Sequence, residues 1–229
     1  MNSNSSSFAN PEAIGALRGY AASRSKRIRK RLLDLALTVP LLMLCAPLWL
    51  MIVLWIRTTS DGPALYRQQR VGVRGTLFTL FKFRSMIAAP DSVHREYVQR
   101  WIRQGESARQ AGGEFKLATD ARITSAGAFL RKYSLDELPQ LLNVLRGEMS
   151  LVGPRPALAY EVENYKAWQF QRLYALPGIT GLWQVSGRNR LSFEQMVRLD
   201  LEYIRSWSLL GDLDILLRTI PAVLRGTGH

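Results

Sequence analysis

The sequence predicts a mixed α/β fold that is dominated by helices, with one N-terminal helix in a membrane and amphipathic helices at the membrane interface. Three observations predict it. An uncharged apolar run occupies residues 35–56, and short extended segments separated by glycines occupy residues 62–86. Residues 193–206 and 212–224 carry apolar side chains at helical spacing. The chain has 229 residues, 47% of them hydrophobic, which is enough apolar material for the core of one ordinary domain.

The chain is strongly basic, with 31 Lys+Arg against 18 Asp+Glu and a net charge of +13. Such an excess indicates an anionic partner: a nucleic acid, an anionic lipid or a phosphorylated substrate. Residues 1–74 hold 11 of the basic and 3 of the acidic residues, so +8 of the +13 lies near the N-terminus. The lone Cys45 excludes an internal disulfide and a thiolate zinc site, and two histidines argue against a histidine metal cluster.

The N-terminal part divides into a tail and a membrane segment. Residues 1–25 are rich in Ser, Asn, Ala and Gly, and we expect a mobile tail there. Residues 26–57 combine a basic flank, with five cations in its first six residues, and an uncharged run of 22 residues. This run has the length of a membrane-spanning helix, and it is too long and begins too late for a signal peptide.

Two prolines, Pro40 and Pro47, interrupt the apolar run. The longer part that Pro47 leaves has twelve residues, from Leu35 to Ala46. These form about 18 Å of helix, against a hydrocarbon core of about 30 Å. Cations flank both ends of the run, and such residues stay on the cytoplasmic side. We therefore expect a re-entrant helix that bends at Pro47; a proline-kinked span is the alternative that the sequence leaves open.

Residues 58–229 are expected to form the rest of the molecule as one domain. Beyond the extended segments, the pattern predicts helices at about residues 91–111 and 135–146, the second ended by Gly147. The sequence contains no phosphate-binding P-loop, no dinucleotide-binding glycine pattern, no nucleophile elbow and no zinc-protease motif. These absences remove support for P-loop nucleotide hydrolysis and for serine or zinc hydrolysis.

The two C-terminal helical segments are amphipathic. Ser192 and Gln195 match a capping box at the start of residues 193–206, and Pro221 is expected to bend residues 212–224. Basic amphipathic helices near tryptophans suit a bilayer interface. Packing in a soluble core is the alternative, and the sequence does not choose between the two for either helix.

The strongest candidate for chemistry is the segment Ser134 to Gln140, which places Asp136 and Glu137 side by side at the opening of a helix. The free N–H groups there favour an ionised carboxylate and also a bound phosphate. A capping box formed by Ser134 and Glu137 is the structural alternative. Adjacent carboxylates do not face each other across a sugar as glycoside hydrolysis requires. One carboxylate as nucleophile and the other on Mg²⁺ is the easier arrangement, and it fits a diphosphate substrate.

Basic side chains surround this pair in the sequence. Arg131 and Lys132 precede it, and two prolines flank Arg155 in the run Gly153 to Pro156. A glycine-rich loop follows, with the aromatic, amide and guanidinium side chains of Trp183, Gln184, Arg188, Asn189 and Arg190. Such groups can stack on a base, bond to its edge and hold phosphates. Together they favour chemistry on a phosphorylated substrate.

At these residues the chain resembles the bacterial sugar transferases that initiate polysaccharide and glycoconjugate assembly, the monotopic phosphoglycosyl transferases. The resemblance covers about residues 30–223. It rests on several motifs in order: Lys30-Arg31 with the apolar run, Phe81 to Met86, Ser134 to Gln140, Gly153 to Pro156, and Pro177 to Gly181 followed by Gly187 to Asn189. The order is that of the short exopolysaccharide-initiating members.

The resemblance implies transfer of a sugar 1-phosphate from a UDP-sugar to undecaprenyl phosphate, with release of UMP. By this resemblance, Asp136 is the nucleophile that forms a covalent phosphosugar, Glu137 binds Mg²⁺ (or Mn²⁺) together with Asp136, and catalysis is ping-pong. The implied phosphate-binding side chains are those of Arg131, Arg155, Lys82 and Arg84, and the implied nucleotide-binding ones are those of Gln184, Arg188 and Asn189.

The resemblance also implies a location. The family places its apolar run as a re-entrant helix in the bacterial cytoplasmic membrane, among anionic phospholipids, with residues 58–229 as a catalytic domain on the cytoplasmic face. Many members have a serine before the bend-forming proline, whereas Ala46 precedes Pro47 here. The carbonyl freed at this membrane bend therefore needs another donor or water.

Some questions stay open at this point. A nucleic-acid partner is not expected, because most of the basic excess lies beside the apolar run and no recognition motif is present. A membrane adaptor without an active site is the other rival. The sequence leaves open the identity of the sugar and of the pathway, the metal ligands in detail, the function of residues 87–115, and the oligomeric state, including a homodimer.

Overall fold

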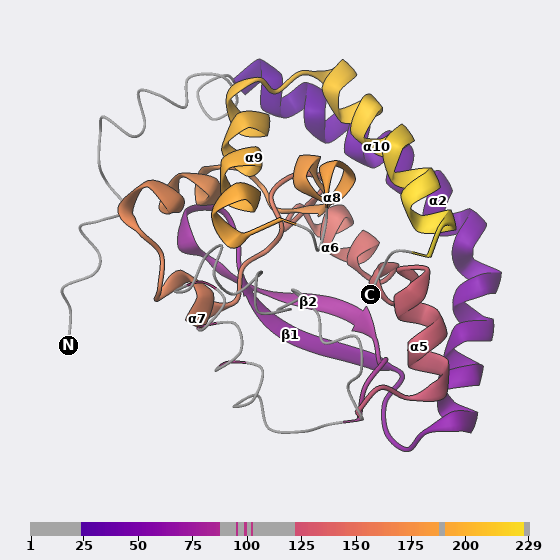
Figure 1. Cartoon of the computed structure of the whole chain (residues 1–229). Coiled ribbons are helices and arrows are strands. Elements are labelled where there is room, and N and C mark those ends of the chain that lie inside the picture. Colours follow the sequence, from indigo (N-terminus) through magenta and orange to yellow (C-terminus); the bar gives the residue numbers. More distant parts are fainter. Residues whose placement is uncertain are drawn as a thin grey trace.

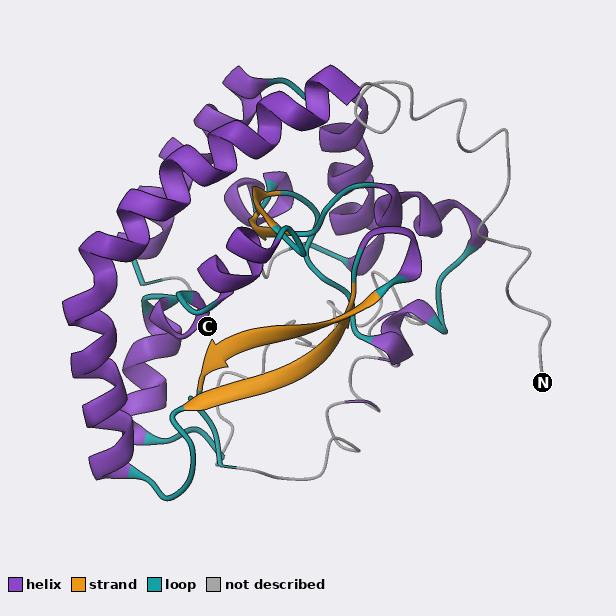
Figure 2. Ribbon diagram, turned by 180° about the vertical axis from the view of Figure 1, so that it is seen from behind, coloured by secondary structure: helices purple, strands orange, loops and turns teal. Residues whose placement is uncertain are grey.

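The computed structural model describes residues 24–87, 122–187 and 191–226, together with residues 95, 99 and 102. Apart from residues 95, 99 and 102, which are helical, the helix expected at residues 91–111 lies outside the described residues. Nearly all of the expected N-terminal tail lies outside them too, as do Arg188 and Asn189. Within the described residues, the architecture is helix-dominated and mixed α/β, as predicted. A long N-terminal helix curves around one side of the molecule, and shorter helices and two small sheets fill its concave side (Figures 1 and 2).

The long helix is α2, which runs from Arg24 to Thr59 and spans 36 residues. It continues through Pro40 and Pro47 as one helix, and its ribbon follows a bent path rather than a straight one (Figure 2). Prolines within a helix are a usual cause of such bending. Among the described residues, one helix is long and apolar enough to cross a membrane, and this helix is α2. Only 11% of its most apolar window is buried, which argues against the core helix of a soluble protein.

The extended segments expected at residues 62–86 are confirmed as a hairpin. Strand β1 (Leu65–Val71) pairs antiparallel with β2 (Leu77–Phe83), with Gln68 opposite Leu80. The connecting turn contains η2 (Val73–Gly75), in which Arg74 has a φ of 55°. A second sheet pairs β3 (Ser150–Val152) parallel with β4 (Gly178–Thr180). The hairpin lies across the concave side of the arc made by α2 (Figure 1).

The remaining described elements are short helices that connect and cover these sheets. In chain order they are α5 (Ser125–Lys132), η3 (Leu135–Glu137), α6 (Gln140–Arg146), α7 (Ala159–Val162), η4 (Ala167–Tyr174), α8 (Leu182–Ser186), α9 (Phe193–Arg205) and α10 (Leu209–Leu224). The helix predicted over residues 135–146 is thus a 3₁₀ turn followed by α6, which ends at Gly147 as expected. The predicted capping box is confirmed: the Gln195 N–H donates to Ser192 Oγ at 3.2 Å, and the Ser192 N–H donates to Gln195 Oε1 at 2.9 Å.

Helix α9 packs inside the domain, so the prediction of an interfacial helix is wrong for this segment. Its apolar stripe is buried, with Met196, Val197 and Ile204 at 1% exposure or less. Each such side chain contributes roughly 1.5–3 kcal/mol when it is fully removed from water. The alternative of a soluble core is therefore confirmed for α9, because the side chains of the small sheets and of neighbouring helices cover its stripe.

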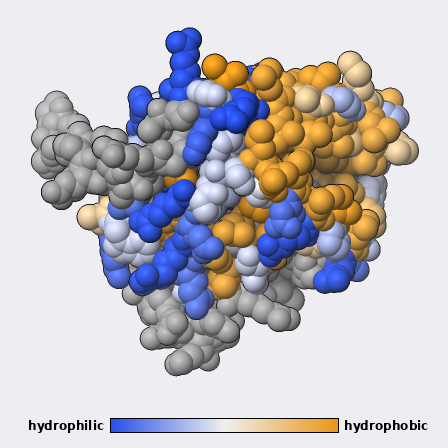
Figure 3. All heavy atoms as spheres, turned by 90° about the horizontal axis from the view of Figure 1, so that it is seen from above, coloured by the Kyte–Doolittle hydropathy of each residue, from blue (hydrophilic) through white to orange (hydrophobic). Residues whose placement is uncertain are grey.

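Helix α10 and the middle of α2 expose their apolar side chains instead. We call these exposed side chains the apolar surface; on α10 they include Leu210, Leu213, Leu217, Ile220 and Leu224. On α2 the most exposed are Met43 and Leu44, at 73% and 76%. Figure 3 views this side and shows the hydrophobic residues gathered over one continuous area. A patch of this kind marks a surface that contacts a membrane or a partner.

Two buried polar networks, which sequence reasoning missed, fix the first half of α2 to the domain. Lys30 Nζ lies 2.7 Å from Asp212 Oδ2, and both side chains are almost fully buried. The same carboxylate accepts hydrogen bonds from Tyr203 Oη at 2.7 Å and Trp207 Nε1 at 3.0 Å. One turn further along α2, Asp34 accepts from Ser150 Oγ at 2.9 Å and from a backbone N–H of β3. The ion pair of Lys30 and the hydrogen bonds of Asp34 offset part of the cost of burying these charges.

Candidate active site

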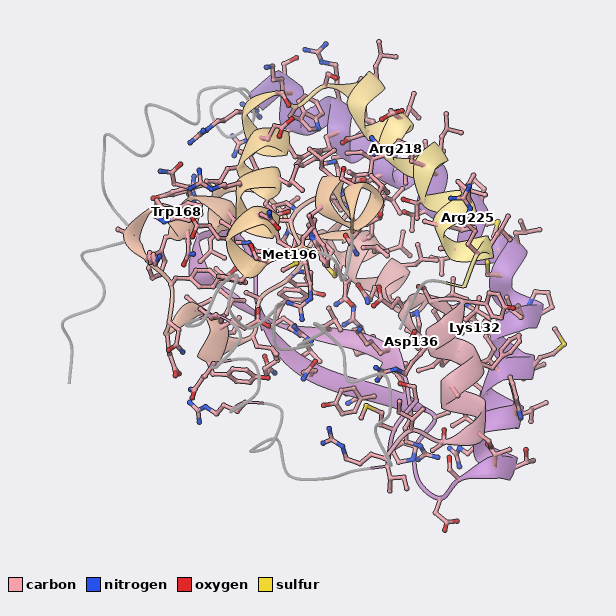
Figure 4. All side chains as sticks on the ribbon, viewed as in Figure 1. Lys132, Asp136, Trp168, Met196, Arg218 and Arg225 are labelled. Carbon is pink, nitrogen blue, oxygen red and sulfur yellow. The ribbon has the colours of Figure 1, made fainter. Side chains whose placement is uncertain are left out.

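The two adjacent carboxylates lie in the turn that connects α5 to α6. Ser134 has a φ of 55°, so the backbone reverses there and η3 starts immediately afterwards. An N-cap residue needs an extended backbone, and the Ser134 side chain makes no capping hydrogen bond. The capping-box alternative for Ser134 and Glu137 is therefore wrong. The Asp136 side chain is buried at 7% exposure, and Figure 4 shows it between α5 and the hairpin.

Lys82, which belongs to the hairpin, forms an ion pair with Glu137. Lys82 Nζ donates to Glu137 Oε1 at 3.0 Å, and both side chains keep 22% of their surface exposed. Lys82 is on β2, and 55 residues separate the two in the chain, so only the packing of η3 on β2 makes this pair. An ammonium group has three N–H donors, so it can hold a carboxylate and a phosphate together. The structure thus places one of the predicted phosphate-binding side chains next to the carboxylate pair.

Two more of the predicted phosphate-binding residues, Arg131 and Arg84, have different surroundings. Arg131, in the last turn of α5, donates from Nη1 to Met86 Sδ at 3.1 Å, beside the end of β2. Arg84 donates from Nη2 to Ser60, to its carbonyl oxygen at 2.7 Å and to its hydroxyl at 2.8 Å. Arg84 therefore fastens the C-terminal end of α2 to β2. These contacts give Arg84 a structural link that the sequence did not show.

Arg155 lies in the rigid loop between two prolines, with its side chain 18% exposed. Its Nη1 donates to both carboxylate oxygens of Glu161, at 3.1 Å and 3.2 Å. The carbonyl oxygen of the next residue, Pro156, accepts a hydrogen bond from Arg70 Nη1 at 3.0 Å. Sequence reasoning missed Glu161 and Arg70, because nothing in their local patterns indicates which distant loop they contact.

The hairpin connects Arg155 to the carboxylate pair. Lys82 is opposite Tyr66, and Arg70 lies four residues after Tyr66, so Lys82, Gln68 and Arg70 share one face of the hairpin. Arg70 donates to Gln68 Oε1 from Nη2 at 2.6 Å. Burial and the charge of Arg155 lower the pKa of Arg70 to about 10, and Glu137 is among the charges that act in the opposite direction. The charges of Arg155 and Glu137 therefore both act on Arg70.

The residues expected to bind the nucleotide are only partly described. Gln184 is in α8, and its Nε2 donates to the Ile179 carbonyl oxygen at 3.1 Å, which ties α8 to β4. Arg188 and Asn189 lie outside the described residues. The predicted contact of these three residues with a nucleotide stays a prediction.

The carboxylate pair fits a hard divalent cation that is shared with a substrate. The described residues contain no group of three His, Cys, Asp or Glu side chains that could hold a metal by themselves. Mg²⁺ is usually bound by one or two carboxylates together with substrate phosphates and water, and Mn²⁺ accepts the same oxygen ligands. Asp136 and Glu137 supply that number of carboxylates, next to basic side chains suited to phosphate.

Comparisons of the sequence with known proteins point to one family. The family model described as bacterial sugar transferase matches residues 25–226. The undecaprenyl-phosphate galactose phosphotransferase of Salmonella typhimurium is 44% identical over 223 residues, which are 96% of this chain and 46% of that protein. The exopolysaccharide production protein ExoY of Rhizobium meliloti is 41% identical over 224 residues, 98% of this chain and 96% of that protein.

The name of a third relative contains glucose, whereas that of the Salmonella relative contains galactose. The UDP-glucose:undecaprenyl-phosphate glucose-1-phosphate transferase of Caulobacter vibrioides is 41% identical over 205 residues, 86% of this chain and 70% of that protein. The chain therefore spans less than half of the Salmonella relative but nearly all of the Rhizobium one. The family match covers the apolar helix α2, the hairpin, the carboxylate pair and the arginine loop together. The chain belongs to the bacterial sugar transferase family.

Proposed function

We propose that this protein transfers a sugar 1-phosphate from a UDP-sugar to undecaprenyl phosphate and releases UMP, as the first membrane step in assembling an exopolysaccharide or another glycoconjugate. The observation that carries this proposal is the buried Asp136 next to Glu137, with Lys82 3.0 Å from Glu137. The names of the Salmonella and Caulobacter relatives supply the class of donor and acceptor.

In the first half-reaction, a carboxylate oxygen of Asp136 attacks the phosphorus that carries the sugar. A bond forms between this oxygen and the phosphorus, and the bond from the phosphorus to the UMP oxygen breaks, so UMP leaves with the electron pair. Charge develops on the oxygens of the transferred phosphate and on UMP. Lys82 is the basic side chain of this site that we expect to stabilise it, and we expect Arg155 to bind a phosphate group of a substrate.

In the second half-reaction, an oxygen of the lipid phosphate attacks the same phosphorus. The bond to Asp136 breaks, and the product is a polyprenyl diphosphate sugar. UMP leaves before the lipid phosphate reacts, so the cycle is ping-pong, and each half-reaction can be studied by itself. Mg²⁺ held by Glu137 and Asp136 would neutralise phosphate charge when bound, and the fit of this pair to such a cation supports its use.

The packing of α2 supports a re-entrant helix. Its first half is fixed to the domain through Lys30 and Asp34, and its second half packs on the hairpin and α5 through Ile52 and Ile56. One domain therefore contacts both halves of a helix whose middle is apolar and exposed. A straight span would carry one end across the bilayer, away from this domain. We place the domain on the cytoplasmic face, because the exposed Arg29 and Arg57 flank the apolar part of the helix.

The experiment that tests this proposal uses the full chain in vesicles that contain undecaprenyl phosphate. Asp136→Asn removes the nucleophile but keeps the size of the side chain, so we expect transfer of labelled sugar phosphate to lipid to fall by about 10³-fold or more. UMP release without acceptor, in an amount up to one per active enzyme, is expected from the wild type only. Asp214→Asn, at an exposed surface ion pair with Arg218, is the matched control and should transfer normally.

Two results contradict the proposal. One is full transfer by Asp136→Asn. The other is a wild type that cleaves the UDP-sugar only when undecaprenyl phosphate is also present, because a covalent phosphosugar on Asp136 requires UMP to leave first. Testing UDP-glucose and UDP-galactose side by side identifies the sugar, since the names of two relatives differ on this point.

A further inference from the structure

Three arginines and two carboxylates form a cluster behind the loop that contains Arg155. The arginine cluster consists of Arg70 on β1, Arg155, Arg172 in η4, Glu161 in α7 and Asp200 in α9. Apart from Arg155, each of these residues is at most 7% exposed. Four separate elements and the loop therefore bring their charges together at one place inside the domain.

Glu161 holds the Arg155 guanidinium by both of its oxygens. One nitrogen of Arg155, Nη1, donates to Oε1 at 3.1 Å and to Oε2 at 3.2 Å. The carboxylate is itself anchored, because Oε2 also accepts from the Leu158 N–H at 3.1 Å. Burial opposes ionisation of Glu161, but the charges of Arg155, Arg70 and Arg172 outweigh it and lower its pKa. Glu161 is therefore a fixed anion against which one end of the Arg155 side chain rests.

The backbone beneath Arg155 is held by the other two arginines. Arg70 donates to the Pro156 carbonyl oxygen at 3.0 Å, and Arg172 Nη2 donates to the Arg155 carbonyl oxygen at 3.3 Å. Arg172 is in turn paired with Asp200 at 2.6 Å. Both ends of the Arg155 residue, its backbone and its guanidinium, are thus restrained. Such restraint suits a group that must present itself to a ligand in one orientation.

The charges of this cluster favour an anion. Three guanidinium groups stand against two carboxylates, so the cluster carries an excess of one positive charge. A charge that is mostly shielded from water attracts an anion more strongly than the same charge on the surface. A guanidinium has five N–H donors in a planar fork that matches a phosphate. Only Arg155 reaches the surface, so it is the member that can meet a ligand.

We propose that Glu161 is a positioning residue, which holds the Arg155 guanidinium in the orientation that binds a phosphate group of a substrate. The inference rests on the proposed function and deepens it, because it names the residue through which Arg155 acts. The phosphate belongs either to the nucleotide or to the lipid. About 13 Å of strand separates the level of Lys82 from Arg70 along the shared hairpin face, which is within the length of an extended nucleotide sugar.

The test uses the full chain in lipid nanodiscs and the variant Glu161→Gln. One arm measures the Kd of UMP by calorimetry, and the other measures the KM of undecaprenyl phosphate. We expect an increase of about tenfold or more in one arm, with the other arm and kcat at saturation within about threefold of the wild type. The arm that changes identifies the phosphate. Glu163→Gln is the matched control, because Glu163 pairs with Arg95 on the surface at 58% exposure and should leave both arms unchanged.

A double-mutant cycle separates positioning from a general structural effect. If Glu161 acts through Arg155, then Glu161→Gln adds nothing to the Kd or KM in an Arg155→Gln background. Additive effects overturn the proposal, and so do wild-type values of Glu161→Gln in both arms. If circular dichroism shows that Glu161→Gln does not fold, Glu161→Asp takes its place, because it keeps the charge but draws the carboxylate back from Arg155. An increase of about threefold or more in one arm that is lost in the Arg155→Gln background supports the role, and unchanged values overturn it.

The calorimetric arm also separates this inference from the proposed function. UMP binding requires no turnover. A wild type that binds UMP but transfers no sugar phosphate contradicts the proposed function alone, and the effect of Glu161→Gln on UMP binding then decides the positioning role. A wild type that neither binds UMP nor transfers sugar phosphate overturns both.

Discussion

At the scale of single residues, the candidate site depends on giving two neighbouring carboxylates different surroundings. Asp136 is buried in the turn after α5, whereas Glu137 points to Lys82 and keeps part of its surface in water. Adjacent residues in a short 3₁₀ turn point in different directions, so one can face a reacting atom while the other faces a cation. The sequence indicated this division of roles. The ion pair between Glu137 and Lys82 shows which face of the hairpin lies next to the two carboxylates.

Lys82→Met tests the importance of this ion pair. The change keeps an unbranched side chain, one atom shorter, but removes its charge, so Glu137 loses this ion pair and the site loses a cation. We expect kcat/KM for the UDP-sugar to fall by about 10²-fold, the size usually found when one charge-stabilising donor is removed. Lys166→Met, at an exposed position, is the control and should remain near wild type. Wild-type kinetics of Lys82→Met would show that the ammonium group takes no part in the reaction.

At the scale of elements, side chains that replace backbone partners hold the site together. Asn143 in α6 accepts from the Phe81 N–H at 3.1 Å and donates to the Thr79 carbonyl oxygen at 2.7 Å, so it pairs with the outer edge of β2 as a neighbouring strand would. Asn143 is fully buried. This pairing sets the position of α6 and the preceding η3 relative to β2, which is the arrangement that brings Glu137 to Lys82.

Helix α5 is fixed to the end of β2 by the absence of a side chain at Gly127. A Cβ at this position would lie 1.9 Å from the Ser85 carbonyl oxygen, which is backbone and cannot swing away. We therefore expect Gly127→Ala to lower the free energy of unfolding by roughly 2–3 kcal/mol, and to lower the Tm measured in detergent accordingly. Gly211→Ala is the control, because its Cβ would meet only Ser208 Oγ at 3.1 Å. Equal Tm values for the two variants would mean that α5 does not pack as closely as described.

At the scale of the whole molecule, the exposed apolar side chains of α2 and α10 lie on one side, and the site lies on the concave side of α2 (Figures 1 and 3). This arrangement suits the proposed function, in which the acceptor is a lipid. The placement follows from how α2 and α10 pack together and from which of their faces the domain leaves uncovered.

The topology of α2 can be tested with single cysteines in a Cys45→Ala background. Arg29→Cys and Arg57→Cys replace exposed residues on either side of the apolar run. For a re-entrant helix we expect a membrane-impermeant maleimide to label both in inside-out vesicles and neither in intact cells. If the helix spans the membrane once, one of these two cysteines is labelled in intact cells. That result would contradict the re-entrant topology. In the wild-type protein, which keeps Cys45 two residues before Pro47, we expect poor labelling of Cys45 in both preparations.

The sequence by itself determined the helix-dominated class, the long apolar N-terminal helix, the extended segments of residues 62–86, the capping box at Ser192 and the ordered motifs of the family, because these depend on local spacing and residue type. Only the tertiary structure decided that the α9 stripe is buried while that of α10 is exposed, since both have the same helical period. It also decided that Lys82 meets Glu137, that Arg84 meets Ser60 and that Glu161 restrains Arg155 in its loop. Amphipathic patterns show which face of an element is apolar, whereas the partner of that face or of a charge depends on packing between segments that are mostly far apart in the chain.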